Sequence, residues 1–201
     1  MFATTPRLLV PDAGQEGSLA LPNGDTHRST GKFSLAPGES MQEKVKIFGI
    51  EDHDDLIRLT RTFLNKMGFV DPQTFYVDGK SGQLGVCEID SGGRPSIKPT
   101  GISTEYFAIL EMLTGKIKET LEHPIQNVPI CVFDFDLPGF TGADLTRDLT
   151  KAFPGLRVII WTGDETNNTE PSMDAGARAV LNKPCSITTL ENKIKETIFA
   201  P

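Results

Sequence analysis

From Val45 onward, short apolar runs alternate with longer segments in which apolar residues recur at helical spacing. The runs have the length of buried strands and end at polar or turn-forming residues, whereas the longer segments have the period of amphipathic helices. The predicted strands are 45–50, 74–77, 129–133, 157–161 and 177–181, and the predicted helices span about 56–67, 103–121, 142–153 and 186–198. This alternation favours an α/β fold in which a parallel sheet is covered on both faces.

Two segments allow more specific predictions. Ser103 is expected to cap a helix whose buried stripe consists of Phe107, Leu110, Leu113, Ile117 and Leu121. The segment between Thr162 and Gly176 is expected to be a poor helix, because proline inside a helix removes a hydrogen-bond donor and asparagine and threonine have low helix propensity. The residues concerned are Asn167, Asn168, Thr169 and Pro171.

Two regions lie outside the regular alternation. Residues 1–43 contain many Gly, Pro, Ser and Thr residues without a helical or strand period, which is typical of a flexible N-terminal tail. Residues 79–102 are punctuated by glycine and proline around the apolar run 84–89, and this pattern predicts an inserted hairpin or an ordered loop after the second strand. The main domain is therefore expected to span 44–201.

Composition narrows the class of protein. The formal net charge of −7, without a cluster of Lys and Arg, disfavours direct binding of nucleic acid or an anionic membrane. The three cysteines are odd in number and lack the spacing of metal ligands, and the N-terminus lacks the pattern of a signal peptide. No apolar run approaches the length of a membrane span. We therefore expect a reduced, cytoplasmic protein.

Polar side chains follow four of the predicted strands where each strand ends: Glu51, Asp52, Asp134, Thr162 and Lys183. If these strands are neighbours in one sheet, the side chains meet at one edge. Three carboxylates held together repel one another and are stable in ionised form only with a cation between them, and oxygen ligands favour Mg²⁺. A carboxylate beside Mg²⁺, with an ammonium and a hydroxyl in reach, is equipped to attack a phosphoryl group. The predicted product is an aspartyl phosphate.

With these residues in place, the chain from about 44 to 200 resembles the receiver domain of two-component response regulators. The motifs that carry the resemblance are Ile50-Glu51-Asp52, Asp134-x-x-Leu137-Pro138-Gly139-x-x-Gly142, Ile159-Ile160-Trp161-Thr162-Gly163, Gly176-Ala177 and Lys183-Pro184. The resemblance implies a flavodoxin-like, doubly wound sheet of five parallel strands. It also implies that Asp134 accepts a phosphoryl group from the phosphohistidine of a histidine kinase or a histidine phosphotransfer protein.

The resemblance further implies a role for each site residue. Asp52 and Asp134 would bind Mg²⁺ directly together with the backbone carbonyl of Asp136, and Glu51 would act mainly through a metal-bound water. Thr162 would hydrogen-bond the phosphoryl group, and Lys183 would form an ion pair with it. His53, beside the acidic pair, is expected to be exposed and without a role.

Several positions depart from the family pattern. Asp134 follows Asp52 by 82 positions, which is far longer than the usual interval and requires the insertion. Val180 occupies the position of an aromatic switch residue, and valine cannot make the swing of a ring. Together with the poor helix after Thr162, these departures predict an atypical output face, with a readout through the insertion.

Beyond its own phosphoryl transfer and dephosphorylation, such a protein is not expected to be an enzyme. Because no DNA-binding or enzymatic segment follows the last predicted helix, the signal is expected to pass to a downstream target protein. The protein would be a monomer or a phosphorylation-dependent dimer.

Two other functions remain open. Phe133-Asp134-Phe135-Asp136 resembles the nucleophile motif of haloacid-dehalogenase-type phosphatases. That family places its second acidic pair after the lysine, however, whereas here Glu51 and Asp52 precede Lys183, and Pro138 stands where its motif carries threonine. The third possibility is a pseudo-receiver, a binding module that keeps the fold without phosphorylation. Retention of all five site residues argues against it.

Overall fold

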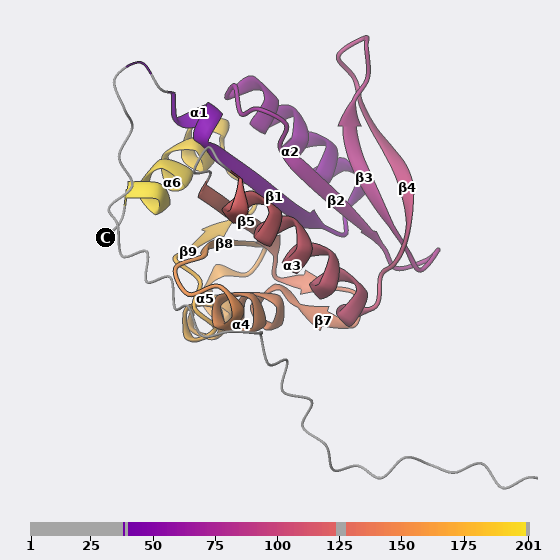
Figure 1. Ribbon diagram of the computed structural model, residues 1–201. Coiled ribbons are helices and arrows are strands. Elements are labelled where there is room, and N and C mark those ends of the chain that lie inside the picture. Colours follow the sequence, from indigo (N-terminus) through magenta and orange to yellow (C-terminus); the bar gives the residue numbers. More distant parts are fainter. Residues whose placement is uncertain (1–37, 39, 124–127, 200–201) are drawn as a thin grey trace, which may run out of the picture.

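The computed structural model describes residues 38, 40–123 and 128–199, and its centre is a sheet of seven strands in the order β4-β3-β2-β1-β5-β8-β9 (Figure 1). The strands of this sheet are β1 (Val45–Glu51), β2 (Gln73–Asp78), β3 (Gln83–Ile89), β4 (Pro95–Ser103), β5 (Val128–Asp134), β8 (Arg157–Thr162) and β9 (Ala179–Asn182). The short strands β6 (Asp136–Leu137) and β7 (Phe140–Thr141) form a separate small hairpin. The helices are α1 (Met41–Lys44), α2 (Asp54–Lys66), α3 (Tyr106–Glu122), α4 (Gly142–Ala152), α5 (Glu165–Asp174) and α6 (Ile187–Phe199).

The five strands predicted from the sequence are all present, and they pair in parallel in the order β2-β1-β5-β8-β9. This arrangement confirms the flavodoxin-like, doubly wound α/β fold. The inserted segment is also confirmed as a hairpin: β3 pairs antiparallel with β2, and β4 with β3. The hairpin therefore widens the sheet on the side away from α6 (Figure 1).

The strands alternate between two hydrophobic layers, because successive side chains in a strand point to opposite faces of the sheet. One layer packs strand residues such as Phe48 and Phe133 against Leu113 of α3 and Leu145 of α4. The other packs Ile47, Val132 and Trp161 against Leu64 of α2 and Leu190 of α6. Because both faces are covered, the central strands are apolar throughout their length and only their ends carry polar groups.

The buried face of α3 differs from the prediction. Leu113 and Ile117 are buried as expected, but the sheet also receives Ile109, whereas Phe107 is 78% exposed and Leu121 is 49% exposed. At about 100° per residue, Ile109 and Ile117 lie close to Leu113 around the helix axis, whereas Phe107 lies about 120° away. The sequence contains two overlapping apolar stripes, and contact with the sheet selects only one. Ser103 does not cap the helix either, because the helix begins at Tyr106 and the Ser103 hydroxyl accepts a hydrogen bond from the backbone N–H of Glu105.

The segment after Thr162 is also different from the prediction, since α5 is a continuous helix of 10 residues with Pro171 inside it. Its start is secured by Asp164, whose carboxylate accepts hydrogen bonds from the backbone N–H and the side-chain amide of Asn167. Toward the other end, the buried Ser172 hydroxyl donates to the carbonyl of Asn168. Capping and packing against the sheet thus outweigh the low propensity of the sequence.

Pro171 nevertheless weakens α5, and its replacement should stabilise the protein. Pro171 is exposed and cannot donate to the carbonyl of Asn167 one turn earlier. Pro171→Ala restores that donor, and we expect the free energy of unfolding to rise by about 1–3 kcal/mol, less a few tenths for the freer unfolded chain. Urea unfolding measures the change. An unchanged or lower stability would mean that the proline fits a bend which the packing of α5 requires.

The hairpin β3–β4 is anchored to helix α2. The Arg58 guanidinium on α2 donates to the carbonyl of Pro95 at the start of β4, with an N–O distance of 2.7 Å, and pairs with Asp54 on its own helix. The outer strand β4 contains Pro95 and Pro99, which cannot donate to a further strand. The insertion is therefore an ordered part of the sheet with a protected edge.

The predicted tail, 1–43, falls almost entirely outside the described residues. Within them, α1 begins at Met41 and leads directly into β1, so regular structure starts slightly before the predicted boundary. No helix among the described residues is both long and apolar enough to cross a membrane.

Candidate functional site

The polar ends of β1, β5, β8 and β9 lie next to one another at one edge of the sheet, as the sequence predicted. In the strand order, β1 and β5 are neighbours, and the chain leaves β1 for a helix on one face and reaches β5 from a helix on the other. Such a switch point is where open α/β sheets bind ligands. Glu51 ends β1 and Asp134 ends β5, so both carboxylates stand at this point.

Lys183 joins these two carboxylates. Its Nζ lies 2.6 Å from Oε2 of Glu51 and 2.9 Å from Oδ1 of Asp134. The three side chains are between 4% and 11% exposed, so the ion pairs are shielded from solvent. The loop that carries Lys183 is held by its backbone N–H, which donates to the carbonyl of Thr162 at the end of β8. One buried ammonium therefore faces two buried carboxylates.

The imbalance of charge shows in Glu51. Burial, followed by the negative charge of Asp134, raises the pKa of Glu51 from 4.5 to about 7, although Lys183 acts in the opposite direction. At neutral pH, the site is therefore short of positive charge. A cation at this position would stabilise the ionised form of Glu51.

Asp52 and His53 complete the acidic cluster. One ligand atom from each of Glu51, Asp52, His53 and Asp134 lies within 4.8 Å of the others. His53 is exposed, as expected, but its Nδ1 lies 2.7 Å from Oδ1 of Asp52 and 3.4 Å from Oε1 of Glu51. Burial acts to lower the pKa of His53, but the hydrogen bond and charge of Asp52, with the charge of Glu51, together outweigh it, so this pKa is raised. The sequence predicts the exposure of His53 and its place beside the acidic pair, but not its contact with both carboxylates.

Thr162 lies at the same edge but is fully buried. Its strand is in register with β5 such that Asp134 is opposite Trp161, the residue before Thr162. The Thr162 hydroxyl accepts hydrogen bonds from the Asn168 side chain and the backbone N–H of Asp164. Within the described ranges, no hydrogen bond connects this hydroxyl to Glu51, Asp52, Asp134 or Lys183.

The helix after Asp134 approaches the site closely. A Cβ added at Gly142 would lie 2.1 Å from the carbonyl oxygen of Asp134, so only glycine fits there. The backbone N–H of Gly142 donates to the carbonyl of Phe135, and Thr141 and Asp144 cap α4 reciprocally. Gly142 thus allows α4 to begin close to Asp134 and holds the intervening loop through its hydrogen bond to Phe135.

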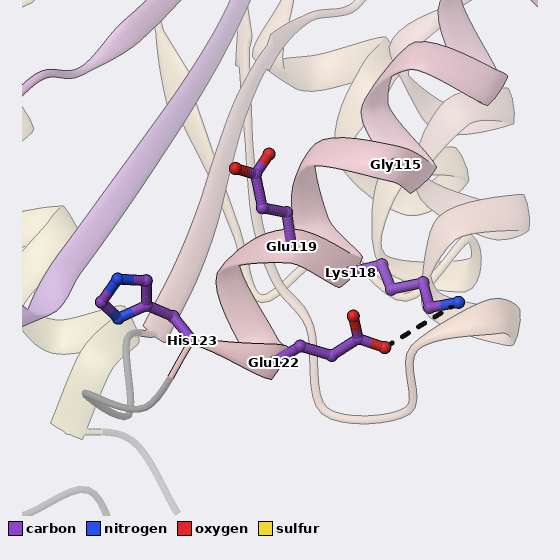
Figure 2. A pocket seen from close by; sticks show the side chains of 5 residues that line it. All are labelled: Gly115, Lys118, Glu119, Glu122 and His123. Carbon is purple, nitrogen blue, oxygen red and sulfur yellow. Dashed lines mark ion pairs between the residues drawn. The ribbon is translucent and has the colours of Figure 1, made fainter.

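Asp136, the remaining predicted ligand, has an exposed side chain outside the acidic cluster. The role predicted for it is that of its backbone carbonyl, and this stays a prediction. A separate depression of about 470 Å³ lies at the end of α3 and is lined by Gly115, Lys118, Glu119, Glu122 and His123 (Figure 2). Because α3 leads into the start of β5, this depression is at the opposite edge of the sheet from Asp134. Lys118 and Glu122 form a solvent-exposed pair there.

Comparison with known proteins agrees with this architecture. Residues 108–195 match the sequence model of the response regulator receiver domain. The chain is 31% identical over 75 residues to the two-component response regulator ARR13 of Arabidopsis thaliana, covering 37% of this chain and 13% of that protein. It is 29% identical over 86 residues to the transcriptional activator protein ExaE of Pseudomonas putida, covering 42% of this chain and 40% of that protein. The chain therefore spans less than half the length of these relatives.

Among solved structures, the receiver domain of a response regulator from Clostridium thermocellum superposes with a TM-score of 0.52 at 20% identity, covering 77% of this chain and 94% of that one. At this identity, the likeness concerns the fold. The doubly wound sheet and the acidic edge define a receiver-like α/β protein. Residues 108–195 thus carry the sequence pattern of a response regulator receiver domain, and the fold of the chain is that of such a domain.

Proposed function

We propose that the chain is a response regulator receiver that accepts a phosphoryl group on Asp134 in a Mg²⁺-dependent reaction. The observation that carries the proposal is the buried contact of Lys183 with both Glu51 and Asp134 at the switch point of the sheet. A buried carboxylate beside an ammonium and further acidic groups is suited to nucleophilic attack on phosphorus. The phosphoryl donor would be the phosphohistidine of a histidine kinase or a histidine phosphotransfer protein.

The donor set fits Mg²⁺. Three carboxylates within reach of one another are hard oxygen ligands, and burial together with the charge of Asp134 raises the pKa of Glu51, an effect that a bound cation would oppose. The imidazole of His53 adds a nitrogen atom to the cluster, but this exposed side chain is paired with the carboxylate of Asp52. Asp52, Asp134 and the carbonyl of Asp136 would hold the ion, and Glu51 would act through its water. When bound, Mg²⁺ would neutralise charge on the transferred group.

The reaction itself requires little from the protein beyond position and charge. A carboxylate oxygen of Asp134 forms a bond to phosphorus while the phosphorus–nitrogen bond of phosphohistidine breaks and the imidazole leaves with the electron pair, to be protonated. Lys183 would move its ion pair from the carboxylate toward the phosphoryl oxygens. Thr162 would donate its hydroxyl hydrogen to one of them. Water later hydrolyses the acyl phosphate. The protein would therefore catalyse only its own phosphorylation and dephosphorylation.

For the readout, the insertion remains our preferred route. The turn that opens the hairpin lies close to the loop after Asp134, because a Cβ added at Gly79 would be 3.1 Å from Cγ of Pro138. Val180 is only half-buried in β9 and has no ring to move. Because α5 is a regular helix, only Val180 and the hairpin β3–β4 support an atypical output face. Deletion of residues 80–101 with unchanged signalling would contradict this route.

We also propose that the receiver domain spans 44–201, with the insertion at 79–102 and a tail at 1–43. The partners would be a histidine kinase or phosphotransfer protein and a downstream protein, without direct binding of nucleic acid. The protein would be monomeric or would dimerise on phosphorylation. A cytoplasmic location is supported by three free thiols, of which Cys87 and Cys131 are buried.

The proposed function is tested by incubating the protein with Mg²⁺ and acetyl phosphate and measuring its intact mass. A receiver gains the mass of one phosphoryl group, and EDTA prevents the gain. A haloacid-dehalogenase-type phosphatase would instead release phosphate through many turnovers without stable labelling. A pseudo-receiver would show neither, and either of these results would refute phosphoacceptor signalling.

A further inference from the structure

The hydroxyl of Thr162 has a hydrogen-bonding pattern that determines what else it can bind. Its oxygen accepts from Nδ2 of Asn168 at 2.8 Å and from the backbone N–H of Asp164 at 3.1 Å. A hydroxyl group has two acceptor positions and one hydrogen to donate. Both acceptor positions of Thr162 are therefore occupied, and only its hydrogen remains available.

That hydrogen has no acceptor within residues 38, 40–123 and 128–199, although Thr162 is 0% exposed. A buried donor without a partner is unfavourable, so such a group is prepared for an acceptor that arrives later. The oxygens of a phosphoryl group on the neighbouring strand end are acceptors only. The bonding state of Thr162 thus matches such a group and would not suit a donor in its place.

Asn168 occupies one of the two acceptor positions of the Thr162 hydroxyl, although it belongs to a different element. It lies in the second turn of α5, six positions after Thr162, and its amide reaches back to the end of β8. We propose that Asn168 is a positioning residue, which keeps Thr162 as a hydrogen-bond donor for the phosphoryl group and connects that group to helix α5. This inference rests on the proposed function of Asp134, because it needs a phosphoryl group at the site.

Substitution at position 168 can reverse the direction of this hydrogen bond. In Asn168→Asp, the amide donor becomes a carboxylate that only accepts, so Thr162 donates its hydrogen to Asp and loses it for the phosphoryl group. In Asn168→Ala, the contact is absent and the hydroxyl rotates freely. We expect a large effect from the first variant and a smaller one from the second.

The experiment titrates the full chain with beryllofluoride in Mg²⁺, since this anion stands in for the phosphoryl group on an aspartate. Trp161, the only tryptophan of the chain, lies beside Thr162 with the Lys183 ammonium 5.6 Å from its ring, and its fluorescence reports binding. Asn168→Asp should weaken beryllofluoride binding about ten-fold or more, the effect of one hydrogen bond to a charged group. The affinity for Mg²⁺, measured without beryllofluoride, should not weaken. General damage to the site would instead change the affinities for Mg²⁺ and for beryllofluoride.

Asn167→Asp is the matched control. It makes the same chemical change one residue away, on an exposed side chain that contacts Asp164 and not Thr162. Equal losses in Asn167→Asp and Asn168→Asp, or wild-type affinity in Asn168→Asp, would overturn the inference while leaving the proposed function intact. If the wild-type protein binds no beryllofluoride, the proposed function fails and the role of Asn168 fails with it.

Discussion

Asp134→Asn is expected to abolish phosphoryl uptake from acetyl phosphate while leaving the protein folded. The amide lacks the nucleophilic oxygen anion, and loss of a nucleophile reduces such reactions by at least about a thousand-fold. The fold should not suffer, because the substitution removes one of two buried carboxylates that compete for Lys183. The charge of Asp134 raises the pKa of Glu51, so the variant should ionise Glu51 more readily.

Intact-mass measurement and urea unfolding at neutral pH together test this prediction. Asp174→Asn is a suitable control, because it makes the same change on an exposed residue at the end of α5. Continued labelling of Asp134→Asn would place the acceptor elsewhere. A loss of labelling accompanied by unfolding would show instead that the carboxylate is needed for structure.

The convergence of the polar side chains at the site could be predicted from the sequence, because each of them lies at or just after the end of a strand. Each of Glu51, Asp134 and Thr162 ends or directly follows an apolar run, and parallel strands bring such ends to one edge. The contact of Lys183 with Glu51 and Asp134 follows from that geometry once the strand order is known. The five parallel strands were predictable for the same reason, since both faces are covered and the runs are therefore apolar throughout.

What the sequence did not reveal depends on contacts between elements. Helix α5 forms in spite of Pro171 because Asp164 caps it and the sheet supports it, and neither effect is visible in residue propensities. The sequence predicts a buried Phe107 because its spacing matches a helical stripe, and only the position of the sheet distinguishes the two stripes of α3 and leaves Phe107 exposed. The contact of Asn168 with Thr162 joins helix α5 to the end of β8. It depends on the conformation of one side chain, which no sequence pattern predicts.

The burial of Lys183 leads to the second large effect. Lys183→Met leaves Glu51 and Asp134 without their counter-ion, and removing one partner of a buried ion pair typically costs about 3–5 kcal/mol. The loss should depend on pH. In the wild-type protein, the pKa of Glu51 is about 7 when folded against 4.5 ordinarily, so between these values the folded state holds a proton that the unfolded state releases. The contribution of Glu51 to stability therefore falls as the pH rises through this window.

Without Lys183, the pKa of Glu51 rises further, because the ammonium lowers it through charge and a hydrogen bond. In metal-free buffer, the variant should be destabilised most at about pH 8 and much less at about pH 5.5, where protonation removes the repulsion. The control is Lys98→Met, because Lys98 and Glu88 have the same N–O distance of 2.6 Å, yet both side chains are largely exposed. Water screens that pair, so its loss should change stability little at either pH. Equal, pH-independent effects in the two variants would contradict this argument, since it is burial, and not the distance between the charges, that makes Lys183 necessary.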